Sequence, residues 1–157
     1  MNHHPDTQNL FSANAVNHDA LSLLRECSGC LKSAVGSMDA IAAMLKECEL
    51  SAMVSRYRAL YGDCSEKCQL LLSRRGEDAA HTMPSKAPSW LTAEVKLAFR
   101  SDDVVLAAVL FDGTNTLIRT LYQELRLAPF ADEECRRLAR RLIGVSEDFR
   151  DDLKPFL

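Results

Sequence analysis

The chain has little of three things that would assign it to a class directly: long apolar runs, net charge and histidine. No apolar run approaches the roughly 20 residues that span a bilayer, so we expect no contact with a membrane. The formal net charge is −3, from 19 basic and 22 acidic residues, and no segment presents a sustained basic face, so we expect no nucleic-acid partner. Residues 1–9 contain no Lys or Arg and no apolar stretch follows them, so we expect no secretory signal.

What is present is the composition of a globular protein of ordinary size. Hydrophobic residues make up 47% of the 157 residues and charged residues 26%, both near the averages for globular domains. A chain of this length buries a continuous core without help from disulfides or a metal. We therefore expect one compact domain.

Apolar residues recur at alternating spacings of three and four in four segments, the pattern of helices that each bury one face. The predicted helices cover about residues 17–46, 51–75, 102–126 and 131–153. The first two seams are Leu24, Cys27, Leu31, Ala34, Met38, Ile41 and Leu45, then Val54, Tyr57, Tyr61, Cys64, Cys68 and Leu71. The other two are Val104, Ala107, Phe111, Thr114, Ile118, Leu121 and Leu125, then Cys135, Leu138, Leu142, Val145 and Phe149. This pattern predicts an all-α four-helix bundle.

The lengths of the connections predict how these helices are joined. Short breaks within each pair make two antiparallel hairpins. Residues 76–101 are too long and too rich in Pro for a tight turn, so we expect a long crossover that holds a short helix at 90–99. Residues 1–16 show no apolar period and are expected to form a flexible arm before a bundle domain at 17–157. Two hairpins joined by a long crossover make a ferritin-like bundle.

Four of the six cysteines, Cys27, Cys30, Cys64 and Cys68, lie on the facing sides of the first predicted hairpin. Cysteines three or four residues apart on one helix close no useful loop, so we expect reduced thiols and a cytoplasmic protein. Two interpretations of the group stay open. The favoured one is that the cysteines pack as small hydrophobic residues. The alternative is a thiolate site for Cu(I) or Zn(II), because soft sulfur ligands favour these ions.

Three short motifs resemble a known family. They are Ser28-Gly29-Cys30, Ala87-Pro88-Ser89-Trp90-Leu91 and Asp112-Gly113-Thr114. With them, residues 20–153 or so resemble the bacterial ferritin-like four-helix-bundle proteins of unknown function. In that family the first and third helices carry a Gly-Glu step, and the crossover holds a short Trp-containing helix. The resemblance implies a ferritin-like fold and a role in stress response or metal handling.

The chain departs from this family at the positions that would bind iron. A ferritin-like di-iron site needs one Glu from each of two helices and a Glu-x-x-His step from each of the other two. Here Cys30 and Thr114 follow the two glycines, no histidine is expected inside the four long helices, and Glu-x-x-His occurs nowhere. We therefore expect no di-iron centre and no resident cofactor, with Cu(I) or Zn as the alternative.

The remaining polar residues form no expected catalytic site. A cysteine nucleophile needs a nearby base, and the four histidines fall in the predicted arm, at its edge or in the crossover. Cys48 and Cys135 lie near helix ends, apart from the other cysteines. Tyr57, Tyr61 and Tyr122 are expected to bring structural hydroxyl groups into the core.

The alternative is that these hydroxyls form a polar pocket with Thr114 or Asp63. The densest basic cluster is Arg136, Arg137, Arg140 and Arg141, which is either a solvated face with ion pairs or the rim of a homo-oligomer contact. We therefore expect a non-catalytic bundle that acts through binding or self-assembly. The alternative function is thiolate metal binding by the cysteines of the first hairpin.

Overall fold

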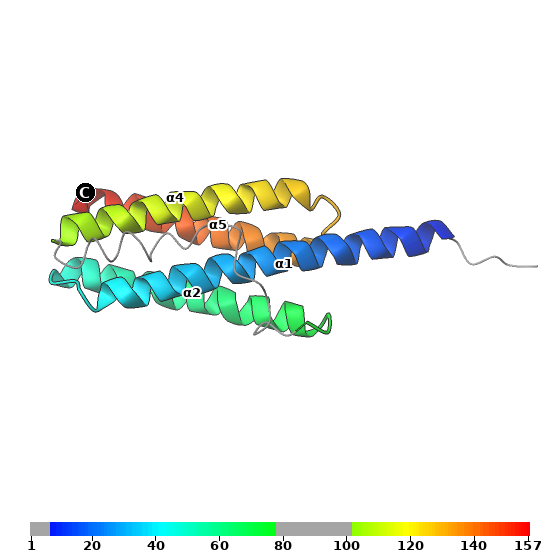
Figure 1. Ribbon diagram of the computed structural model, residues 1–157, viewed down its shortest axis with the longest axis horizontal. Coiled ribbons are helices and arrows are strands. Elements are labelled where there is room, and N and C mark those ends of the chain that lie inside the picture. Colours follow the sequence, from blue (N-terminus) through cyan, green and yellow to red (C-terminus); the bar gives the residue numbers. More distant parts are fainter. Residues whose placement is uncertain (1–6, 78–101) are drawn as a thin grey trace, which may run out of the picture.

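The computed structural model describes residues 7–77 and 102–157, which form a bundle of four long helices (Figure 1). These are α1 (Thr7–Ala42), α2 (Cys48–Ser73), α4 (Asp103–Leu127) and α5 (Glu133–Leu153). A short 3-10 turn, η2 (Lys154–Phe156), follows α5. The predicted all-α four-helix class is therefore confirmed, whereas the predicted crossover helix at 90–99 lies outside the described residues.

Contacts at the helix ends establish the directions of the four helices. α1 packs against α2 and α4, and α5 packs against the same two helices from the opposite corner. The carboxylate of Asp103, at the start of α4, accepts hydrogen bonds from the backbone N–H groups of Lys46 (3.1 Å) and Glu47 (2.6 Å), between α1 and α2. Asp132, just before α5, pairs with Arg75 at the end of α2. α4 therefore runs parallel to α2, α5 runs parallel to α1, and every adjacent pair is antiparallel.

Caps at the ends of α2, α4 and α5 explain why the prediction placed these helices well. Asp102 and Asp132 occupy N-cap positions, where their carboxylates accept hydrogen bonds from backbone N–H groups (3.3 and 3.1 Å). After α2, Gly76 has a φ of 74°, a left-handed conformation that costs glycine little. The predicted bounds of these helices agree with the structure to within three residues.

The first helix differs most from its prediction, because it begins at Thr7 and ends at Ala42. Residues 7–16, expected to belong to a flexible arm, are helical. No Gly or Pro occurs between Thr7 and Ser28, so nothing interrupts the backbone hydrogen bonds, and an existing helix extends at low cost. The carboxylate of Asp19 accepts a hydrogen bond from the N–H of Phe130 in the α4–α5 turn (2.8 Å). Upstream of Asp19, α1 runs past this end of the bundle (Figure 1).

The core consists of one buried stripe from each helix. All predicted seam residues of α1 and α2 are buried except Leu45, and all those of α5 are buried except Val145. These two exceptions are half-buried at the edge of the core. The three-and-four spacing therefore identifies the buried faces of these helices correctly.

α4 buries five of its seven predicted seam residues, Ala107, Thr114, Ile118, Leu121 and Leu125, but its buried stripe is wider than the predicted one. Leu106, Leu110 and Leu117 are fully or almost fully buried, although the predicted seam omits them, whereas Val104 is 52% exposed and Phe111 is half-buried. The reason is that α4 is apolar over a wide arc, and spacing alone does not say how much of this arc the bundle covers. By length and composition alone, α4 is also the one helix among the described residues that is long and apolar enough to cross a membrane. In the bundle it packs against α1 and α5.

One hydrogen bond between side chains crosses the buried interface of α2 and α5. The hydroxyl of Tyr61, which is buried as predicted, lies 2.7 Å from Oγ of Ser146. Ser146 donates its own proton to the carbonyl oxygen of Leu142 (2.7 Å), so Tyr61 is the donor in the bond between the two hydroxyls. Its ring stands edge-on to Phe149, with 6.4 Å between centroids. The bond therefore satisfies the polar groups of a core contact that is otherwise apolar.

We predict that Tyr61→Phe lowers the free energy of unfolding by about 1–2 kcal/mol, because Ser146 loses a buried hydrogen-bond donor. Tyr122→Phe is the matched control: Tyr122 is 49% exposed and water replaces its bond to Glu147, so we expect a change below about 0.5 kcal/mol. Urea unfolding at one protein concentration measures both variants. Equal losses would contradict a special role for the buried bond.

Candidate functional site

All four cysteines of the predicted metal site are buried where α1 faces α2. Cys27 and Cys64 are fully buried, and Cys30 and Cys68 expose no more than 2% of their surface. The thiol of Cys68 donates a hydrogen bond across the hairpin to the carbonyl oxygen of Leu24 (3.3 Å). The structure therefore brings the predicted residues into one region of the core.

Cys135 joins this group, so the prediction that it lies apart is wrong. It is fully buried in the first turn of α5, which packs against both α1 and α2. Its proximity is visible in the electrostatics of Cys27. Burial raises the pKa of Cys27 well above its ordinary value, and repulsion from the thiolates of Cys68, Cys30, Cys135 and Cys64 raises it further.

Burial keeps these thiols protonated. It raises the pKa of Cys68 and of Cys135 to about 12, and it raises that of Cys64 above its ordinary value. Metals bind the thiolate, so metal binding at this group would have to release protons from buried thiols. Within residues 7–77 and 102–157, no group of three or more His, Cys, Asp or Glu side chains is arranged to hold a metal ion. A Cu(I) or Zn(II) site would need these side chains to rearrange, and it stays a prediction.

The described part of the chain offers the thiols no histidine base. His18 is the single histidine in it, and its side chain is 83% exposed beside Asp19. The expectation that the long helices contain no histidine is wrong, because His18 lies inside α1. Since His18 points into solvent, it supplies no partner for a cysteine nucleophile in the core.

The tyrosine hydroxyls do not form the alternative polar pocket with Thr114 or Asp63. Burial and a hydrogen bond to Asp152 (2.6 Å) raise the pKa of Tyr57 to about 12, so this hydroxyl is a neutral donor at the bundle edge. Tyr122, expected in the core, is 49% exposed. Neither proposed partner takes part: Thr114 bonds to a carbonyl of its own helix, and Asp63 is exposed. These hydroxyls are therefore structural.

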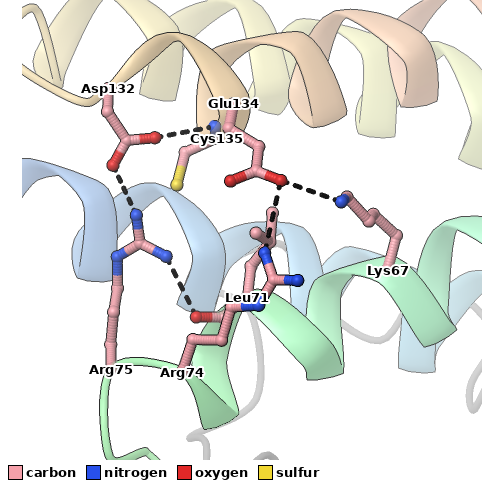
Figure 2. Close-up of polar contacts among 7 residues, drawn as sticks. All are labelled: Lys67, Leu71, Arg74, Arg75, Asp132, Glu134 and Cys135. Atoms are coloured by element: carbon pink, nitrogen blue, oxygen red, sulfur yellow. Dashed lines mark hydrogen bonds and ion pairs between the residues drawn. The ribbon is translucent and has the colours of Figure 1, made fainter.

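A polar network joins the end of α2 to the start of α5 (Figure 2). Arg75 extends from α2 to the carboxylate of Asp132, which also caps α5 through the N–H of Cys135 (3.1 Å). Glu134 adds ion pairs to two basic side chains of α2, at 2.9 and 3.6 Å. The network sits directly beside Cys135 and holds the first turn of α5 against α2.

α4 carries a second stripe, here called the outer seam, that runs along the edge of the core stripe and shares Ile118 and Leu125 with it. Its members alternate in spacing by four and three: Val104, Ala108, Phe111, Asn115, Ile118, Tyr122 and Leu125. Ile118 and Leu125 form its floor, with 7% and 8% exposed, whereas Val104 and Tyr122 are 52% and 49% exposed. Such spacing is typical of a helix face that packs against another helix. The bundle therefore leaves a helix-packing face of α4 partly open.

The C-terminal half of the outer seam forms the floor of an open groove of about 820 Å³ between α4 and α5. Its rim is basic, with Arg119 and Arg126 from α4 and Arg136 from α5. Arg136 donates to backbone carbonyls of the α4–α5 turn, whereas Arg119 and Arg126 form no ion pair with any described residue. The N-terminal half carries the exposed carboxylate of Asp112 instead. Opposite charges are thus separated along one helix face.

The other arginines of the cluster on α5 lie in solvent. Arg140 pairs with Glu133 (2.9 Å), and Arg137 and Arg141 are exposed. Arg136 alone reaches the groove, which local spacing on α5 did not reveal because the groove is completed by α4. The four-and-three spacing of the outer seam is the signal in the sequence that points to this surface.

No protein-family model, curated protein or solved structure matches the chain. The candidate site is therefore defined by geometry. The cysteine group is sealed in the core, whereas the outer seam and its basic groove are open to a partner.

The pH dependence of stability tests the junction between α2 and α5. Burial raises the pKa of Asp132, but hydrogen bonds from Cys135 and Arg75 outweigh this effect and hold it below its ordinary value. A carboxyl whose pKa falls on folding stabilises the folded state at neutral pH. This stabilisation is lost as the pH falls through about 4 and below.

We predict that Asp132→Ala loses about 1–2 kcal/mol of stability at neutral pH, because both the cap and the ion pair disappear. Asp132→Asn keeps a capping oxygen and removes only the charge, so its loss is smaller. The deficit of the Asn variant shrinks as the pH falls below about 4, because the wild-type carboxyl becomes protonated as well. Urea unfolding at several pH values measures this. A deficit that stays constant with pH would contradict the role of the ion pair.

Proposed function

We propose that the protein is a non-catalytic, ferritin-like bundle that acts through binding or self-assembly. The observation that carries this proposal is the outer seam of α4. A second helix-packing stripe on one helix, with Val104 and Tyr122 about half exposed, is more than a monomeric bundle needs. Beside it lie three arginines around one groove. This combination of apolar floor and charged rim is the anatomy of an interaction surface.

The helix directions support the ferritin-like part of the proposal. α2 ends and α4 begins at opposite ends of the bundle, and all adjacent pairs are antiparallel. Two hairpins joined by a connection that spans the bundle have this arrangement. A role in stress response or metal handling completes the proposal and rests on the resemblance described above, whereas a cytoplasmic location rests on the free cysteines.

The chemistry of the described residues supports a role without catalysis. Buried thiols and tyrosines have raised pKa values, so they are neutral and weakly nucleophilic at physiological pH. His18, the single histidine among the described residues, is exposed to solvent, so it is not placed to act as a base for these groups. Active sites shift the pKa values of catalytic groups towards the working pH, whereas the pKa values of these thiols and tyrosines are shifted further above it.

We predict that the wild-type protein associates in a concentration-dependent way and that Tyr122→Asp weakens the association, because it places a charge in the outer seam. Leu70→Asp is the matched control, since Leu70 is 45% exposed but lies on α2. Sedimentation equilibrium measures both variants, and circular dichroism checks that they are folded. A wild-type protein that stays monomeric at high concentration would contradict self-assembly and leave binding to another partner.

The alternative function is thiolate metal binding, which the gathering of Cys27, Cys30, Cys64, Cys68 and Cys135 in one part of the core favours. Soft sulfur ligands of this kind select Cu(I) or Zn(II). Binding would require deprotonation, so affinity would rise with pH.

Titration of the reduced protein with Cu(I) or Zn(II) against a competing chelator separates the two functions. We predict that the Cys48→Ala variant takes up no metal, because it lacks the exposed cysteine and the other five thiols are buried. If the alternative holds, uptake is present in Cys48→Ala and lost in Cys27→Ala combined with Cys68→Ala. Uptake that the double variant leaves unchanged rules out the thiolate site.

A further inference from the structure

We propose that the outer seam is the contact surface of a homodimer in which two copies pack α4 against α4, antiparallel, about a two-fold axis at Asn115. This inference rests on the self-assembly part of the proposed function and specifies its surface and symmetry. Symmetric dimers use the same patch on both copies, so the patch has to be complementary to itself. The outer seam meets this condition in both shape and charge.

When the outer seams of two copies pack antiparallel, large side chains of one copy lie opposite smaller ones of the other. In an antiparallel pair centred on Asn115, residues whose numbers sum to about 230 lie level with each other. Tyr122 then lies opposite Ala108 of the second copy, which is the smallest side chain of the seam. Ile118 lies opposite Phe111, so the floor of the groove receives an aromatic ring. The two asparagines meet on the axis, where a paired polar residue fixes the register of a helix pair.

The same register pairs opposite charges. Asp112 lies level with Arg119 of the second copy, and the two-fold axis repeats this contact. Both side chains are exposed, and neither forms an ion pair within the part of the chain that the structure describes. In a parallel arrangement this edge of each helix would lie on opposite sides of the interface, so Asp112 and Arg119 of the two copies would not meet. Charge therefore selects the antiparallel dimer.

The dimensions of the surface also favour a second copy of α4. The outer seam extends along roughly 30 Å of helix, which a helix of the same length covers from end to end. Arg126 lies near the beginning of the second α4, where the carboxylate of Asp102 is exposed. Among the described residues that line the groove, Tyr122 is the one aromatic residue, so they do not form the series of stacking platforms that nucleic-acid bases use.

A charge exchange tests this arrangement. Arg119→Asp and Asp112→Arg each place like charges opposite one another twice in a homodimer, so we expect the dissociation constant of each to rise about tenfold or more. An equimolar mixture of the two variants restores both ion pairs in a heterodimer. Sedimentation equilibrium and native mass spectrometry of the single variants and the mixture measure these effects. Arg137→Asp, the same charge change at an exposed position of α5 outside the groove, is the control.

The expected result is weakened homodimers for both variants, a heterodimer of wild-type strength in the mixture, and an unchanged Arg137→Asp dimer. A dimeric wild type that the exchange leaves unaffected overturns the α4 contact while self-assembly stands. Weakened single variants without rescue in the mixture overturn the Asp112–Arg119 pairing. A wild type that is monomeric throughout overturns the dimer and leaves the proposed binding function, which an acidic helical partner would then serve.

Discussion

Two aspartates tie the ends of the second hairpin to the ends of the first, and the arrangement of the bundle depends on them. Asp103 holds the start of α4 against the backbone between α1 and α2, while Asp132 holds the start of α5 against Arg75 at the far end of α2. The apolar seams would allow several pairings of the four helices, because burial has no direction. The carboxylates do have direction. They place each helix beside an antiparallel neighbour, and they bring Cys135 close to the cysteines of the first hairpin.

The composition of α4 follows from a second demand on the same helix. One face fills the core with Leu106, Leu110 and Leu117, and the outer seam repeats the apolar spacing on another side. A helix with two such faces resembles a membrane span in composition, although its polar residues lie in an ordered pattern. Asp112 and Arg119 flank the outer seam at an interval of seven residues. That interval places them on one edge of the helix, which is where charges select a partner.

Much of the fold could be predicted from the sequence, because seams, caps and Gly76 are local signals. The start of α1 could not, since polar composition suggested an arm but nothing between Thr7 and Ser28 breaks a helix. The full width of the buried face of α4 could not either: spacing located Ala107, Thr114 and Leu121 but omitted Leu106, Leu110 and Leu117, because α4 is apolar over a wide arc. The candidate site was harder still: the groove takes Arg119 from α4 and Arg136 from α5, and such a site exists only after the helices meet.

The buried thiols allow transient opening of the helix bundle to be followed by chemical labelling. Five of its cysteines are buried and Cys48 is exposed. A thiol reagent reaches the buried sulfurs only while the helices are separated, so the extent of labelling measures how often the bundle opens. Because Cys48 is exposed, it reacts without any opening of the bundle, and its labelling rate serves as the reference. Because Cys27 belongs to one hairpin and Cys135 to the other, the order in which they are labelled tells whether the hairpins part as units or unravel from one end.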